Sequence, residues 1–201
     1  MFKEHKRTSG ADRGDLDRHV ACASRRSFLA LAAWGLAATV FPTIAAASFA
    51  PPAAARRLSF YNTHTDESVE TCYWEHGAYV PTALEQLNAV LRDHRTGEIR
   101  QMSPALIDLV YALSVSLGSK SPVQVISGYR SPATNELLRA GGSGGVAERS
   151  LHLTGEAVDL RYEDRPLSQV RDTALALRGG GVGYYPRSGF VHIDVGRCRS
   201  W

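Results

Sequence analysis

Two histidines and one aspartate carry the clearest chemical signal in this 201-residue chain. His152 and Asp159 lie seven residues apart, and His192 follows in a later apolar run. Two imidazoles and one carboxylate suit a zinc ion whose fourth position holds water. Because zinc in such a site lowers the pKa of that water and polarises a carbonyl group, it is suited to hydrolysis. The three residues are therefore candidate ligands of one zinc ion in a hydrolytic site, and the alternative is that the histidines are ordinary core or surface residues.

Two strands are needed to bring these residues together. The runs Ala157–Leu160 and Phe190–Val195 are predicted as strands. If they are neighbours in one sheet, Asp159 and His192 converge, while the first histidine reaches back from the preceding loop. Asp194 lies two residues after His192, so both side chains point to the same face. No role is assigned to the other histidines, which are His5, His19, His64, His76 and His94.

The rest of the chain mixes predicted helices and strands without a regular alternation. Apolar spacing and boundary residues predict helices at Pro81–Arg92, Pro104–Leu117, Ala133–Ala140 and Pro166–Leu177. Short apolar or alternating runs predict further strands at Leu58–Asn62, Val69–Trp74, Val123–Ile126 and Val182–Tyr185. The glycine-rich residues 141–145 are predicted as a flexible loop. This irregular order predicts an α+β domain rather than a doubly wound parallel sheet.

Length and composition bound the class of protein. A chain of 201 residues, 44% hydrophobic and 21% charged, is typical of one globular domain with a tail. The formal net charge is only +3. That balance is too mild to predict a nucleic-acid partner, but it is compatible with an anionic polymer.

The first 55 residues are predicted to be an export signal and a processed linker, followed by a single domain over residues 56–201. Arg25 and Arg26 precede an apolar run, Leu29–Ala47, which is rich in alanine and free of charge. The paired arginines resemble the twin-arginine export signal. A transmembrane anchor is the competing interpretation. The weak hydrophobicity of the run, with Gly35 and Pro42 inside it, favours the signal.

Cysteine usage predicts one disulfide in an exported domain. Cys22 falls in the predicted signal, so the mature chain keeps Cys72 and Cys198, near the two ends of its domain. A pair of this kind in an oxidising compartment favours a disulfide over two buried thiols.

The motifs around the predicted metal ligands resemble the zinc peptidases of the D-alanyl-D-alanine carboxypeptidase type. That family shares its fold with the VanX dipeptidases, phage endolysin peptidases and the hedgehog signalling domain. The family motif His-x-x-Gly-x-Ala-x-Asp is matched from His152 to Asp159, and its last metal histidine by His192. Residues 127–131 resemble its Ser-Gly-Tyr-Arg-Ser element, and residues 181–194 resemble its branch of exported murein endopeptidases.

The resemblance implies a small antiparallel sheet with helices packed around it and one zinc site held by His152, Asp159 and His192. It also implies hydrolysis of peptide crosslinks, or of other D-amino-acid peptide bonds, in peptidoglycan. The protein would then act in the periplasm or cell envelope. Arg130 is expected to hold a substrate carboxylate or the developing oxyanion, and Ser127 to add a hydrogen bond. Three bonds remain open as the target: D-alanine to diaminopimelate, diaminopimelate to diaminopimelate, and terminal D-alanine.

One position departs from the family pattern. Many relatives carry an acidic general base three residues before the last metal histidine, where this chain has Gly189. Asp194 is the nearest acidic candidate and is predicted to be catalytic: the roles of general base and of a partner that orients His192 are both favoured over that of a ligand. Glu148 is more typical of a solvated loop charge. The missing acid keeps a second hypothesis open, namely a non-catalytic zinc-binding cell-wall module of the same fold.

Overall fold

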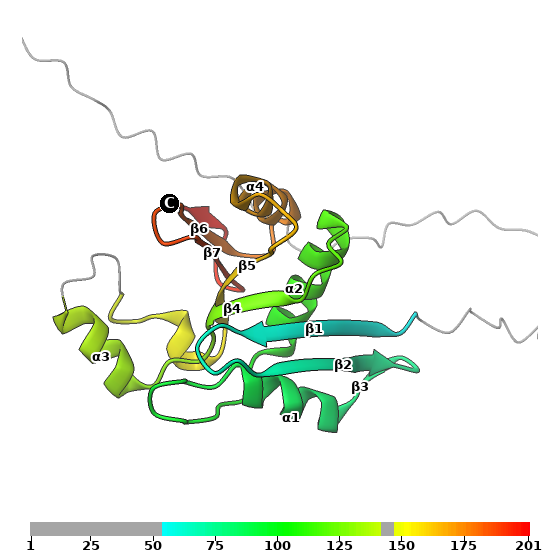
Figure 1. Cartoon of the computed structure of the whole chain (residues 1–201), viewed down its shortest axis with the longest axis horizontal. Coiled ribbons are helices and arrows are strands. Elements are labelled where there is room, and N and C mark those ends of the chain that lie inside the picture. Colours follow the sequence, from blue (N-terminus) through cyan, green and yellow to red (C-terminus); the bar gives the residue numbers. More distant parts are fainter. Residues whose placement is uncertain (1–53, 142–146) are drawn as a thin grey trace, which may run out of the picture.

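The computed structural model describes residues 54–141 and 147–201 of the chain as an α+β domain (Figure 1). Its strands are β1 Arg56–Asn62, β2 Ser68–Glu75, β3 Ala78–Tyr79, β4 Val123–Ser127, β5 Ala157–Arg161, β6 Gly181–Tyr185, β7 Phe190–Asp194 and β8 Arg199–Ser200. Its helices are α1 Pro81–Val90, α2 Pro104–Leu117, α3 Pro132–Ala140 and α4 Leu167–Leu177, with a 3₁₀ turn, η1, at Leu151–Thr154. Almost all of the predicted export signal, and the predicted loop after residue 141, lie outside the described residues.

All eight strands form one sheet in the order β3-β2-β1-β4-β5-β7-β6-β8. The α+β class is confirmed, but the expectation of a small antiparallel sheet is wrong in two respects. The sheet is large, and the pairs β1–β4 and β6–β8 are parallel. The first parallel pair is joined by a long connection, since β2, β3, α1 and α2 all lie between β1 and β4 in the chain.

The predicted helices and longer strands are confirmed to within two residues at each end. Helix α2 begins at Pro104, whose fixed φ suits a first helical position. It ends at Gly118, which adopts the left-handed conformation. The short elements β3, β8 and η1 were not predicted, because two to four residues carry no period. Within the described parts of the chain, no helix is both long and apolar enough to cross a membrane.

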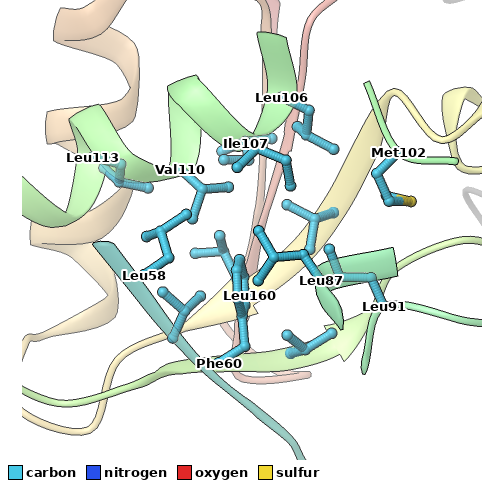
Figure 2. Packing of buried hydrophobic residues seen from close by; sticks show 14 of the residues in the cluster. Leu58, Phe60, Leu87, Leu91, Met102, Leu106, Ile107, Val110, Leu113 and Leu160 are labelled. Carbon is cyan, nitrogen blue, oxygen red and sulfur yellow. The ribbon is translucent and has the colours of Figure 1, made fainter. Parts of the chain in front are cut away.

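The hydrophobic core joins one face of the sheet to α1, α2 and α4. Figure 2 shows Ile107 and Val110 of α2 among side chains from strands, including Phe60 of β1 and Leu160 of β5. Both Phe60 and Leu160 are fully buried. Helix α3 stands apart from the other helices (Figure 1) and buries only Thr134 and Asn135. Because strand side chains alternate, every second residue of β5 and β7 is left to the other face.

The predicted disulfide between Cys72 and Cys198 is wrong. Within the described residues, Cys72 and Cys198 are not joined to each other. The Cys72 thiol donates to the carbonyl of Trp74 at 3.4 Å, and the Cys198 thiol donates to the carbonyl of Arg178 at 3.3 Å. Cys72 lies on β2 and Cys198 directly precedes β8, near opposite edges of the sheet. Six strand spacings of about 4.8 Å separate those strands, whereas a disulfide needs Cα atoms within about 7 Å.

A buried aspartate joins the loop after α1 to the segment before α3. Asp93 accepts hydrogen bonds from the backbone N–H groups of Arg95 and Ser131, both at 2.9 Å. Burial alone would raise the pKa of Asp93, but the hydrogen bonds from Thr134, Ser131 and Arg95 outweigh it and hold the pKa well below its usual range. The carboxylate therefore fixes the position of Arg130, which directly precedes Ser131.

We expect Asp93→Ala to lower the free energy of unfolding by about 2–4 kcal/mol, because two backbone donors lose their acceptor. The exposed control Asp172→Ala should change it by less than about 0.5 kcal/mol. Both values come from chemical denaturation. Since the pKa of Asp93 is depressed in the folded state, its contribution is present above pH about 4 and is lost as the pH falls further. An equal loss in both variants would contradict this role.

Candidate metal centre

The face of the sheet opposite the core carries one row of residues across four strands. Ser127 of β4 pairs with Asp159 of β5, Asp159 pairs with His192 of β7, and His192 pairs with Gly183 of β6. His152 belongs to the turn η1, which leads into β5. The predicted convergence of the strands that carry Asp159 and His192 is thus confirmed, because β5 and β7 are direct neighbours.

The three predicted ligands form one buried cluster. One ligand atom from each of His152, Asp159 and His192 lies within 4.8 Å of the other two. His152 Nε2 is 3.2 Å from His192 Nδ1 and 3.3 Å from Asp159 Oδ1. His192 Nδ1 is 2.8 Å from Asp159 Oδ1. In the parts of the chain that the structure describes, this is the one such group of three or more potential metal ligands.

The hydrogen-bond partners of His152 and His192 determine which nitrogen of each ring is protonated. The other nitrogen then presents its lone pair to the cluster. His152 Nδ1 lies 2.7 Å from the carbonyl oxygen of Gly128, so this nitrogen carries the proton and donates it. His192 Nε2 lies 3.0 Å from a carboxylate oxygen of Asp194, so it donates as well. The other nitrogen of each neutral ring then points a lone pair at the other ring and at Asp159. When both rings are neutral, three acceptors therefore face one another with no donor among them.

A divalent cation fits this arrangement. Ligand atoms placed tetrahedrally at about 2.0–2.1 Å from zinc lie about 3.3 Å apart, close to the 3.2 and 3.3 Å separations of His152 from its two partners. The same acceptors attract a proton. Burial lowers the pKa of His192, but hydrogen bonds to Asp159 and Asp194 outweigh burial and raise it to about 8. For Asp159, contacts with both histidines outweigh burial and hold its pKa well below the usual range.

Gly128 sets the orientation of His152 through its backbone. A Cβ atom at this position would lie 2.3 Å from the carbonyl oxygen of Leu91, so only glycine allows the chain to pass so close. The neighbouring Tyr129 N–H donates to the same Leu91 carbonyl at 2.7 Å. The Arg130 N–H donates to the carbonyl of His152 at 3.1 Å. The segment 127–131 therefore holds the predicted ligand His152 in place, a role that its sequence did not reveal.

Asp194 is fully buried against His192. Its two oxygens accept hydrogen bonds from His192 Nε2 at 3.0 Å, from Arg199 at 2.7 and 3.1 Å, and from the N–H groups of Gly181 and Gly196 at 3.0 and 2.9 Å. These donors outweigh burial and hold the pKa of Asp194 well below its usual range. The carboxylate thus contacts the side of the His192 ring that faces away from the metal cluster.

Gly189, which stands where many relatives have the acidic general base, lies in a turn. Gly189 has φ of +73° in the connection between β6 and β7, a left-handed conformation in which glycine is strongly favoured over an acidic residue. Glu148 is exposed, as expected for a loop charge. Among the described residues that line the cleft, Asp159 is the one acidic side chain. The residues 142–146 contain no acidic side chain either.

Arg130 reaches the cluster with part of its donor capacity unused. It is 9% exposed, and its Nη2 lies 3.6 Å from Asp159 Oδ2. Its Nη1 donates to Asn135 Oδ1 over a long 3.4 Å, and its buried Nε has no hydrogen-bond partner in the described structure. Burial lowers the pKa of Arg130, but an arginine remains charged at neutral pH. Ser127 lies beside it on the wall of the same cleft.

A cleft of about 430 Å³ opens onto the cluster, and several of its residues carried no recognisable signal in the sequence. Its lining includes His64, His94, Arg95, Arg149, Arg199 and Trp201. The rings of His64 and His94 stack at 3.9 Å between centroids. Burial, together with the charges of His64 and Arg95, lowers the pKa of His94 to about 4. Of these residues, Arg149 lies shortly before His152, and Arg199 and Trp201 lie shortly after His192.

Comparisons with known proteins identify the family of this chain. The family described as peptidoglycan L,D-endopeptidase MepK matches residues 50–201. Peptidoglycan L,D-endopeptidase MepK of Escherichia coli (strain K12) is 46% identical over 179 residues, which cover 89% of this chain and 97% of the relative. The probable peptidoglycan L,D-endopeptidase MepK of Haemophilus influenzae is 36% identical over 89% of this chain and 95% of its own length. The crystal structure of Serratia marcescens L-Ala D-Glu endopeptidase ChiX covers 48% of this chain and 69% of its own, at 24% identity and a TM-score of 0.32, too low to support an argument.

A mixed sheet that presents two histidines and one aspartate beneath an open cleft defines a metallopeptidase centre. The chain belongs to the family of peptidoglycan L,D-endopeptidase MepK, since the family match spans its whole described domain. The branch predicted from residues 181–194 is therefore confirmed.

We expect His152→Ala and His192→Ala each to abolish metal binding. Protein zinc sites use three or four protein ligands, and the two that remain in each variant are too few to keep the ion bound through dialysis. Metal content after dialysis, measured by elemental analysis, checks this. His76→Asn is the matched control, since His76 is exposed on a turn with φ of +52° that asparagine tolerates. A wild-type metal content in either ligand variant would contradict the site.

Asp194→Asn tests whether this carboxylate is a ligand or a partner of one. We expect the variant to keep one metal ion but to bind it about 10–100-fold more weakly, as is typical when the partner of a ligand histidine is changed. Competition against a chelator measures the affinity. Complete loss of the metal would instead make Asp194 a ligand, and unchanged affinity with lost turnover would make it a general base.

Proposed function

We propose that this protein is a zinc-dependent peptidase that hydrolyses peptide crosslinks of peptidoglycan. The observation that carries the proposal is the convergence of three acceptor atoms from His152, Asp159 and His192 in a family of peptidoglycan endopeptidases. The name of these relatives, L,D-endopeptidase, favours the bond between two diaminopimelates, which joins an L-centre to a D-centre. The crosslink from D-alanine to diaminopimelate joins two D-centres.

His152, Asp159 and His192 would hold the zinc ion. Bound in an open site, zinc supplies an activated water and polarises the scissile carbonyl. Arg130 is positioned to bind a substrate carboxylate or the negative charge that develops on that carbonyl oxygen. Its partly unused, planar set of donors beside Asp159 supports this role. Ser127, on the same wall, is proposed to add a hydrogen bond to the substrate.

Asp194 is proposed to orient His192 rather than to transfer a proton to or from the substrate. A general base must approach the proton that it removes, within about 3 Å or through one water. Asp194 is fully buried, and both of its oxygens already accept hydrogen bonds from His192, Arg199 and the backbone. By holding the Nε2–H of His192, it keeps the Nδ1 lone pair aimed at the metal position.

The charge of the cleft supports an anionic substrate. Arg95, Arg130, Arg149 and Arg199 line it, whereas Asp159 is its one acidic side chain in the described residues. Arg199 is paired with Asp194, so three arginine charges and that of a bound metal face one acidic side chain. A cleft with such an excess of one sign attracts ligands of the opposite sign. The stem peptides of peptidoglycan carry free carboxylates and fit this field.

A substrate in the cell wall requires that the protein reach the cell envelope. The twin-arginine signal predicted at Arg25 and Arg26 supports export by that route, and the envelope as the site of action follows from the family. We propose that residues 1–55 provide this signal and linker and that residues 56–201 are the peptidase domain. With the signal removed, no segment would remain as a membrane span.

Digestion of isolated sacculi tests the proposed activity. The zinc-loaded protein should release new muropeptides whose masses match cleavage between two diaminopimelates, and a chelator should stop the release. His152→Ala is the control that keeps the fold but lacks a ligand. An unchanged muropeptide profile with zinc bound would instead support the alternative of a zinc-binding wall module without catalysis, for which the absent acid at Gly189 is the one favourable observation.

A further inference from the structure

Trp201 occupies a fixed position on the wall of the cleft. Its backbone continues the pairing of β8 with β6: the Trp201 N–H donates to the Val182 carbonyl at 3.2 Å, and the Tyr184 N–H donates to the Trp201 carbonyl at 3.0 Å. Trp201 as a whole is 50% exposed, and it lines the cleft. The exposed part of this large side chain therefore lies at the candidate active site.

Three contacts hold the indole in one orientation. Its Nε1–H donates to the hydroxyl of Tyr185 at 2.7 Å. The guanidinium carbon of Arg199 lies 4.9 Å from the ring centre. A Cβ atom on Gly183 would come within 2.7 Å of the indole, so the absence of a side chain there leaves room for it. A ring restrained in this way loses little conformational entropy when a ligand covers it.

The indole also lies close to the metal ligands. Its ring centre is 5.3 Å from that of His192, and the two planes are inclined by 48°. Gly183, the residue beneath it, pairs directly with His192 in the sheet. A substrate bond placed at the metal would thus bring its neighbouring residue to the exposed face of Trp201.

We infer that the exposed indole face of Trp201 is a substrate subsite for the peptide residue that flanks the scissile bond. This inference rests on the proposed function. The position near His192 favours the peptide over the glycan, because the sugar is attached at the far end of the stem, away from the crosslink. Aromatic rings bind alkyl chains and peptide planes through apolar contact. The stacked rings of Tyr185 and Phe190, 4.7 Å apart, extend the same wall.

Steady-state kinetics on a crosslinked stem-peptide dimer without glycan test the subsite. We expect Trp201→Ala to raise KM about three- to ten-fold, the loss expected for one aromatic contact, with Trp201→Phe in between. Zinc affinity should stay within two-fold of wild type, roughly the error of such measurements. Gly183→Ala should raise KM in the same way although it keeps the indole, because the new methyl group displaces the ring. Trp74→Phe, on β2 and outside the cleft, should leave KM unchanged.

Stopped-flow tryptophan fluorescence gives a readout that does not need turnover. Mixing the zinc-loaded protein with the dimer should change its emission before cleavage, in wild type and in Trp74→Phe but not in Trp201→Phe. An unchanged KM in both Trp201 variants, or a loss of zinc affinity that accounts for the whole effect, would overturn the subsite. The subsite would also be overturned if the change in tryptophan emission appeared only with substrates that carry glycan. If wild type neither binds nor cleaves the dimer, the proposed function itself fails, which is a separate outcome.

Discussion

The pairing of Asp159 with His192 across β5 and β7 is the constraint on which the site depends. This register places a carboxylate and an imidazole side by side on the face of the sheet that the helices leave open. Shifting either strand by one residue would turn its ligand into the core and expose Val191 or Leu160 instead. The hydrophobic core on one face therefore enforces the geometry of the metal centre on the other.

Around this pair, the site is built from buried polar groups that fix the ligands rather than from the ligands alone. The Gly128 carbonyl holds His152, and Asp194 holds His192, each through the nitrogen that does not face the cluster. Arg199 and two backbone N–H groups in turn hold Asp194. With both rings locked, three lone pairs are kept close together, an arrangement that a cation stabilises. The same locking leaves Asp194 without a free lone pair for proton transfer.

The cleft combines two kinds of wall above the metal position. Arginines supply positive charge to one wall, and few acidic side chains in the cleft oppose it. Tyr185, Phe190 and Trp201 supply aromatic surface to the other wall. A peptide that carries carboxylates on an alkyl framework fits both. Charge attracts such a ligand over a distance, while apolar contact acts only on the residue that touches the ring. The two walls therefore make separable contributions to binding.

The sequence by itself predicted the candidate metal ligands, the α+β class and most helices and strands, because each depends on local spacing or on a motif of a few residues. His152, Asp159 and His192 are recognisable at that scale. The tertiary structure decided what long-range pairing controls: the parallel pairs of the sheet, the separation of Cys72 from Cys198, and the burial of Asp194. It also brought Trp201 to the cleft. No local pattern encodes these features, because each is set by which strands become neighbours after the chain has folded.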